Sequence, residues 1–143
     1  MSFDLKITNG DLVIQKSDLA TVVNADKLIQ DLLKMALTTA GANILHPWYG
    51  SLVSRTLIGS HLQSDIIFSI AKTQLQNSVE SLKNLQNIQI SNGQKVTPDE
   101  QIAFINDISI IRNSADPRIF QVIIKVLNRS FGRVSAAFTV NNT

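Results

Sequence analysis

The last third of the sequence alternates apolar and polar residues, and this alternation is the strongest constraint on the fold. It runs through residues 118–128 (RIFQVIIKVLN) and 133–140 (RVSAAFTV), and more briefly through residues 107–112 (DISIIR). Because successive side chains of a strand point to opposite faces, each long run places four apolar residues on one face. These residues are Phe120, Val122, Ile124 and Val126 in the first run, and Val134, Ala136, Phe138 and Val140 in the second. Turn signals separate the runs, which therefore predict an antiparallel meander whose apolar face needs a covering layer.

The middle of the chain predicts the helices that supply this layer. Apolar residues recur at three- and four-residue spacing in residues 24–38 and again from about residue 62 to residue 85. Asn24 is expected to cap the first helix, and Gly41 is expected to stop it. Both helices are therefore expected to pack on the meander.

Three shorter elements are predicted around these helices. Residues 51–58 indicate a short helix or turn, and residues 86–90 (QNIQI) indicate a strand. In residues 97–101 (TPDEQ), Thr97 is a predicted N-cap and Glu100 closes a capping box, so a short helix should begin there.

The N-terminus predicts a β-hairpin, in which residues 4–8 and 12–15 pair around the turn Asn9-Gly10 and residues 17–23 form a connector. The predicted fold class is therefore α+β: an N-terminal β-hairpin and two main helices packed on a mostly antiparallel C-terminal sheet. The chain has 143 residues, a typical length for one domain, so residues 1–143 are expected to form a single domain.

Composition narrows the function classes. The chain has no cysteine, which excludes disulfides and thiolate metal sites. Its net charge is only +2, and its basic residues are dispersed, so no nucleic-acid partner is expected. No apolar run approaches the ~20 residues that cross a bilayer, and the first residues lack the pattern of a signal peptide. We therefore expect a soluble protein with no membrane partner.

Candidate catalytic and metal-binding residues are few. A glycosidase needs two carboxylates, but Glu100 is explained as a capping residue and Glu80 as part of a solvated helix face. His46 and His61 have no neighbouring carboxylate at metal-ligand spacing. No nucleophile elbow and no phosphate-binding glycine loop is present. The sequence thus predicts no catalytic residue, no metal, no cofactor and no small-molecule substrate.

The stretch HPWYG contains the only tryptophan and the only tyrosine of the chain. Pro47 restricts the residue before it, Trp48 and Tyr49 offer large apolar faces, and Gly50 permits unusual backbone geometry. We favour a buried structural corner. An exposed partner-binding knob is the main alternative, and a small-molecule site is the least favoured interpretation.

Residues 28–51 (LIQDLLKMALTTAGANILHPWYGS) resemble the core signature of a known family. It comprises the small baseplate wedge proteins of contractile-tailed bacteriophages, is often called lysozyme-like or sheath initiator, and includes the type VI secretion baseplate subunit. The signature joins a helix to a Pro-aromatic-Gly corner. The matching residues are Gln30, Asp31, Leu37, Thr38, Gly41, Pro47, Tyr49 and Gly50.

The resemblance implies a non-enzymatic structural protein of the virion, located in the tail baseplate and assembled in the host cytoplasm. Its implied partners are the wedge scaffold subunits, the tail sheath protein, and tube or hub proteins. The family docks the sheath by sharing β-strands, which is a form of β-augmentation. A tail-associated peptidoglycan hydrolase and a generic α+β protein-binding module remain the alternatives.

The strands suggest where such docking would occur, because residues 118–128 are apolar on both faces. We therefore expect the sheet of residues 107–140 to dock the sheath through a free edge, and the sequence does not say which strand forms it. The candidate docking residues are Ile119, Ile123, Leu127, Val134, Ala136 and Phe138.

The sequence departs from the family at one motif. Many members carry Glu-Pro-Arg at the end of the long helix, where this chain reads ESLKNLQNIQI. The similar Asp116-Pro117-Arg118 lies between later predicted strands, so the role of Glu-Pro-Arg is assigned to no residue here.

Overall fold

A computed structural model describes residues 2–58 and 64–141 of the chain. Its C-terminal part is a three-stranded antiparallel sheet with the order β7-β8-β9, formed by β7 (Ile102–Arg112), β8 (Ile119–Asn128) and β9 (Arg133–Asn141). The predicted meander is confirmed, and so is the apolar face of its two long strands, whose eight residues are all buried. The first strand begins at Ile102 rather than at Asp107, because Ile102 already packs in the core and pairs with Asn128.

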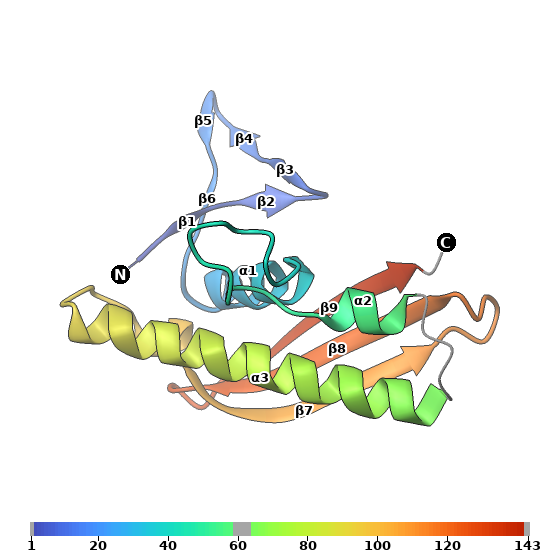
Figure 1. Cartoon of the computed structure of the whole chain (residues 1–143). Helices are drawn as coiled ribbons and strands as arrows, with labels where there is room; N and C mark the ends of the chain where they lie inside the picture. Colours follow the sequence, from blue (N-terminus) through green and yellow to red (C-terminus); the bar gives the residue numbers. More distant parts are fainter. Residues whose placement is uncertain (1, 59–63, 142–143) are drawn as a thin grey trace.

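Two long helices cover one face of this sheet (Figure 1). Helix α1 (Asn24–Leu37) contacts mainly β9, and helix α3 (Ser64–Ser91) contacts mainly β7. The short helix α2 (Val53–Leu57), which lies within the residues predicted to form a short helix or turn, packs on α3. Leu28 and Leu32 of α1 and Leu75 of α3 are almost fully buried between the layers. The predicted α+β class is therefore confirmed.

Helix α3 is longer than expected and includes residues 86–90, for which a strand was wrongly predicted. The reason is tertiary: the Gln86 side chain is buried and donates from Nε2 to the carbonyl of Glu100 at 2.7 Å. Its Oε1 accepts from the amide of Ile102 at 2.9 Å, so Gln86 joins the helix to the start of β7. The helix ends at Ser91, and Gly93 (φ +80°) follows it in a Schellman motif, in which the amides of Gly93 and Gln94 donate to the carbonyls of Ile90 and Gln89. The predicted start near Leu62 lies outside the described residues.

The N-terminal residues form three small antiparallel pairs, which we call the N-terminal arm (residues 4–22). They are β2 (Ile7–Thr8) with β3 (Asp11–Leu12), β4 (Ile14–Gln15) with β5 (Asp18–Leu19), and β1 (Asp4–Leu5) with β6 (Thr21–Val22). The arm projects beyond α1 as an open loop of strands (Figure 1). The Asn9-Gly10 turn is confirmed, since both residues have the positive φ of a two-residue turn and β2 pairs with β3 around it. The predicted pairing of residues 4–8 with residues 12–15 is otherwise wrong, because β1 pairs with β6 and β4 pairs with β5.

Two other N-terminal predictions are wrong. Residues 17–23 are no connector, because Lys16 and Ser17 adopt positive φ and form a second hairpin turn without the usual Asn-Gly signal. Asn24 makes no side-chain cap for α1, since Val23 occupies the cap position. The Asn24 Oδ1 instead accepts a hydrogen bond from the Thr97 hydroxyl at 3.1 Å.

The capping box of Thr97 and Glu100 is present, but the helix that it begins is the three-residue 3-10 turn η1 (Pro98–Glu100). Residues 102–112 then follow as strand β7. Helix α1 ends at Leu37, four residues before Gly41, so Gly41 does not stop it. Gly41 (φ +88°) instead donates its amide hydrogen to the carbonyl of Pro47 at 2.9 Å.

Candidate functional site

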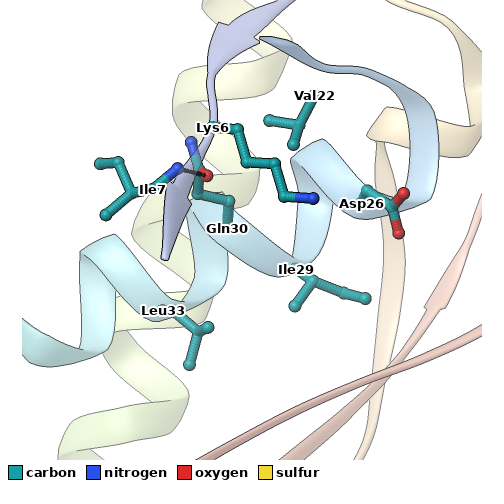
Figure 2. Close-up of a pocket in the computed structure, with 7 residues that line it drawn as sticks. All are labelled: Lys6, Ile7, Val22, Asp26, Ile29, Gln30 and Leu33. Atoms are coloured by element: carbon teal, nitrogen blue, oxygen red, sulfur yellow. Dashed lines mark hydrogen bonds between the residues drawn. The ribbon is translucent and has the colours of Figure 1, made fainter. Parts of the chain in front are cut away.

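Gln30 of α1 anchors the N-terminal arm to the helical layer. Its Oε1 accepts from the amide of Ile7 at 2.9 Å, which Figure 2 shows as a dashed line. Its Nε2 donates to Asp4 Oδ2 and to the carbonyl of Leu5, each at 2.8 Å. An unsatisfied buried amide costs about 1–3 kcal/mol, so these three bonds fix the arm at a defined place. The family-motif residue Gln30 therefore has a structural role.

A pocket of about 270 Å³ lies between the arm and α1 beside this anchor (Figure 2). Its lining residues are Lys6, Ile7, Val22, Asp26, Ile29, Gln30 and Leu33. The side chain of Gln30 already makes its hydrogen bonds to the arm. We therefore interpret this pocket as the gap between the arm and α1, not as a ligand site.

A cluster of charges reinforces the anchor. Lys34 forms ion pairs with Asp4 and, at 3.3 Å, with Asp31, and Lys27 pairs with Asp31 at 2.7 Å. Burial acts to raise the pKa of Asp4, but the hydrogen bonds from Lys34 and Gln30 outweigh it and hold that pKa below its ordinary value. Burial acts to lower the pKa of Lys34, but Asp4 and Asp31 raise it above its ordinary value. The motif residue Asp31 thus helps to hold the arm.

The second half of the motif is a corner at which Gly50 and Ser51 return to the end of α1. The Ser51 amide donates to the carbonyl of Thr38 at 2.8 Å, and its hydroxyl donates to the carbonyl of Ala36 at 2.6 Å. From the other side, the Ser78 hydroxyl of α3 donates to the Gly50 carbonyl at 3.0 Å. Ser51 and Ser78 were not identified from the sequence, because no local pattern indicates their long-range partners.

The corner itself divides into a buried and an exposed part. Gly50 is buried, as the favoured interpretation requires, and Tyr49 is half-buried against the core. Pro47 and His46 are exposed, and Trp48 is 53% exposed, so a buried position for Pro47 and Trp48 is wrong. The hydrogen bonds that return the chain to the end of α1 come from Ser51, and Pro47 contributes only its main-chain carbonyl, which accepts from the amide of Gly41.

Residues 43–48, which we call the corner loop, include the exposed part of the corner and the residues before it. This loop presents apolar side chains to solvent. Ile44 is 93% exposed and Leu45 is 83% exposed. Asn43 Oδ1 accepts from the amides of Leu45 and His46 at 3.0 and 3.3 Å, and the His46 and Trp48 rings meet edge to face. The signal that could have identified this surface is the Ile44-Leu45 pair outside any helical or strand pattern.

The six candidate docking residues of the sheet fall on opposite faces. Val134, Ala136 and Phe138 are buried under the helices, so a partner cannot reach these side chains in the folded chain. By contrast, Ile119, Ile123 and Leu127 are half-buried on the other face of the sheet, which no described helix covers (Figure 1). Two further exposed apolar residues lie on this open face, Phe104 beside Leu127 and Ile111 beside Gln121. They were missed because the start of β7 was placed too late and Ile111 was counted only as a strand member.

The two edges of the sheet differ. Along β7 the pairing register shifts twice, between Ile102 and Phe104 and between Ile105 and Asp107, and the strand carries charges at Asp107 and Arg112. Bulges and edge charges are devices that prevent a further strand from pairing. Strand β9 pairs continuously with β8 and has no charge after its first residue, Arg133. No other described segment hydrogen-bonds to its outer edge.

The two glutamates occupy unlike environments. Glu100 is fully buried, and its carboxylate accepts hydrogen bonds from Ser2 Oγ at 2.6 Å and from the amides of Thr97 and Asn24 at 3.3 and 3.4 Å. Glu80 is exposed on α3. His46 lies in the exposed corner loop, and His61 lies outside the described residues.

Among residues 2–58 and 64–141, no group of three or more histidine or acidic side chains is arranged to hold a metal ion. No helix in the same part of the chain combines the length and apolar character that crossing a membrane requires.

No protein-family model and no curated protein matches the sequence. The fold is similar to that of a solved Geobacter sulfurreducens protein described as a "putative tail lysozyme", with a TM-score of 0.53 and 12% sequence identity. The match covers 93% of this chain and 97% of that one. At this identity the likeness establishes the shared fold.

Proposed function

We propose that this chain is a structural subunit of a contractile-tail baseplate wedge, and that it docks the first sheath ring by accepting a sheath strand at the edge of β9. Three observations support the proposal: the family resemblance of residues 28–51, the fold shared with a tail protein, and the open edge of β9. The edge of β9 supports the proposal most strongly. A long, regular edge strand with few charges promotes aggregation of a free protein, whereas in an assembly it can pair with a strand of a partner.

The corner loop is the proposed contact with the wedge scaffold subunits. An exposed apolar group on a fixed backbone loses little conformational freedom on binding, which favours a protein partner. Ile44, Leu45 and Trp48 form such a group, and residues 41–54 contain no charged side chain. The exposed-knob interpretation is therefore proposed for Pro47 and Trp48, while Gly50 holds the loop in place. Tube or hub proteins are further proposed neighbours in the virion.

We further propose that the chain is not an enzyme, despite the name of its structural neighbour. A lysozyme-type reaction needs a carboxylic acid and a second carboxylate facing one substrate. Glu100 has no exposed surface and already binds three donors, and Glu80 belongs to a solvated helix face. Neither residue is placed as that reaction requires.

Proline substitution in each edge strand tests the docking proposal, because proline removes a main-chain N–H and is tolerated only where that N–H is unpaired. Adjacent residues of a strand point their N–H groups in opposite directions, so Ala136→Pro and Ala137→Pro sample both directions on β9. Ser109→Pro on β7 is the control. We expect the β9 variant that folds to enter wedges and fail to nucleate sheath, whereas a folded Ser109→Pro nucleates normally.

A density map of the assembled tail makes the same test without relying on the folding of variants. The proposal requires a sheath strand beside β9. A strand beside β7, or normal sheath nucleation by every folded β9 variant, would overturn it.

A further inference from the structure

Beside the free edge of β9 lies an apolar groove of about 490 Å³. Its walls come from three parts of the fold: the β2–β3 turn of the N-terminal arm, one face of α1, and Ala137 and Phe138 of β9. The side chains of the arm and of α1 that shape the groove are Ile7, Gln30, Leu33, Lys34 and Leu37. The groove and the open strand edge are therefore continuous.

The chemistry of the walls selects an uncharged, apolar occupant. The charged residue in the lining, Lys34, is neutralised by Asp4 and Asp31. The amide of Gln30 is engaged by the arm through three hydrogen bonds. These two side chains leave no unsatisfied charge or amide for a polar ligand to neutralise, while the β9 main chain offers hydrogen bonds along the groove.

An extended peptide matches both features at once. A strand that pairs with β9 points every second side chain toward α1 and the others toward the open face of the sheet. The row that points toward α1 enters the groove, where it meets Leu33, Leu37 and Ile7. Apolar residues at alternate positions of the strand would pack against these groove residues. A charged residue at one of the same positions would be buried without a partner.

We propose that this groove is the specificity site for the strand that β9 accepts, and that the N-terminal arm, held by Gln30, forms its outer wall. The proposal rests on the docking function proposed above. It adds that the groove recognises apolar side chains at every second position of the arriving strand. The anchor of Asp4, Gln30 and Lys34 would then serve binding by holding the arm in place as a wall of the groove.

Two synthetic peptides of about six residues, a typical strand length, provide the probe. One alternates valine with threonine, and the other alternates serine with threonine. Binding is followed by NMR of the full chain. We expect only the valine peptide to shift the methyl signals of Leu33, Leu37 and Ile7 and to slow amide exchange within residues 134–141.

Matched variants locate the binding. Leu37 is 52% exposed and Ile111 on β7 is 51% exposed, so Leu37→Asp and Ile111→Asp place the same charge at equally accessible positions. Leu37→Asp is expected to weaken binding of the valine peptide by roughly tenfold or more, as loss of a central apolar contact does. Ile111→Asp should leave it unchanged. Gln30→Leu should weaken it as well, because the arm is released.

The outcomes separate this inference from the docking function. If β9 variants abolish sheath nucleation while Leu37→Asp and Gln30→Leu nucleate normally, the groove proposal is wrong and the docking function stands. If the valine peptide binds at the groove while β9 variants nucleate sheath normally, the docking function is wrong and the groove binds another strand. Equal binding of both peptides, or of neither, would overturn the groove proposal.

Discussion

Gly50 lies so close to the end of α1 that a Cβ atom at this position would come within 2.4 Å of the carbonyl oxygen of Thr38. The same oxygen accepts the amide hydrogen of Ser51 at 2.8 Å, and Gly50 has a φ of +114°. The chain thus leaves α1, forms the exposed corner loop and returns to the point of departure. This close contact explains sterically why position 50 requires a glycine.

Gly50→Ala should therefore destabilise the fold by about 2 kcal/mol or more, since strained backbone and overpacking each cost ~1–3 kcal/mol. Gly41→Ala is the matched control, because Gly41 also has a positive φ (+88°) but has no atom within 4 Å of a built Cβ. It should cost only about 1–2 kcal/mol. Urea denaturation midpoints decide the matter, and equal losses in the two variants would contradict the steric explanation.

Trp48→Ala tests whether the corner loop serves binding or stability. Buried large aromatic residues cost about 3–5 kcal/mol when truncated to alanine, but Trp48 is 53% exposed. We expect a loss well below that range and a clear loss of wedge assembly. Leu75→Ala, at a fully buried position, is the contrasting variant and should cost ~2–5 kcal/mol. If the Trp48→Ala protein has a normal denaturation midpoint and assembles normally into wedges, Trp48 contributes to neither stability nor binding.

The Asp4–Lys34 pair predicts a pH dependence. Because the pKa of Asp4 is lowered in the folded chain, its contribution to stability is present above the ordinary value of 3.8 and is lost as the pH falls through the folded value. Asp4→Asn should therefore lower the denaturation midpoint at pH 7, and the deficit should shrink in strong acid. At the alkaline end, the contribution of Lys34 is lost as the pH rises through its raised pKa.

A double-mutant cycle with Lys34→Gln checks that the pair is responsible for this dependence. The two losses at pH 7 should be less than additive, because either substitution removes the same ion pair. Strictly additive losses, or a deficit of Asp4→Asn that does not change with pH, would refute the assignment.

The proposal that the chain is not an enzyme predicts no clearing band in peptidoglycan zymography, because Glu100 is fully buried and Glu80 lies exposed on α3. If a band appears, Glu80→Gln and Glu100→Gln identify its source. Circular dichroism must accompany Glu100→Gln, since this buried carboxylate accepts three hydrogen bonds. A band that disappears in a folded glutamine variant would establish hydrolysis and overturn the non-enzymatic proposal.

Much of the fold could be predicted because it depends on local periodicity. The alternation in residues 118–128 and 133–140 defined β8 and β9 and their buried faces. The capping box at Thr97 was also predictable, since its donors and acceptors lie within four residues. The same local rules failed at residues 86–90, where apolar and polar residues alternate over a short stretch. There, the bonds from Gln86 to Glu100 and Ile102 keep the chain helical.

The candidate site was only partly accessible to the sequence. The sequence by itself determined that one face of the meander needs a covering layer and that a helix followed by a corner lies within residues 28–51. Only the tertiary structure decided that no other described segment pairs with the outer edge of β9 and that Trp48 is exposed. The physical reason is that periodicity specifies which side chains share a face. Which edge stays unpaired and which corner residue is covered depend on contacts between segments that are distant in the sequence.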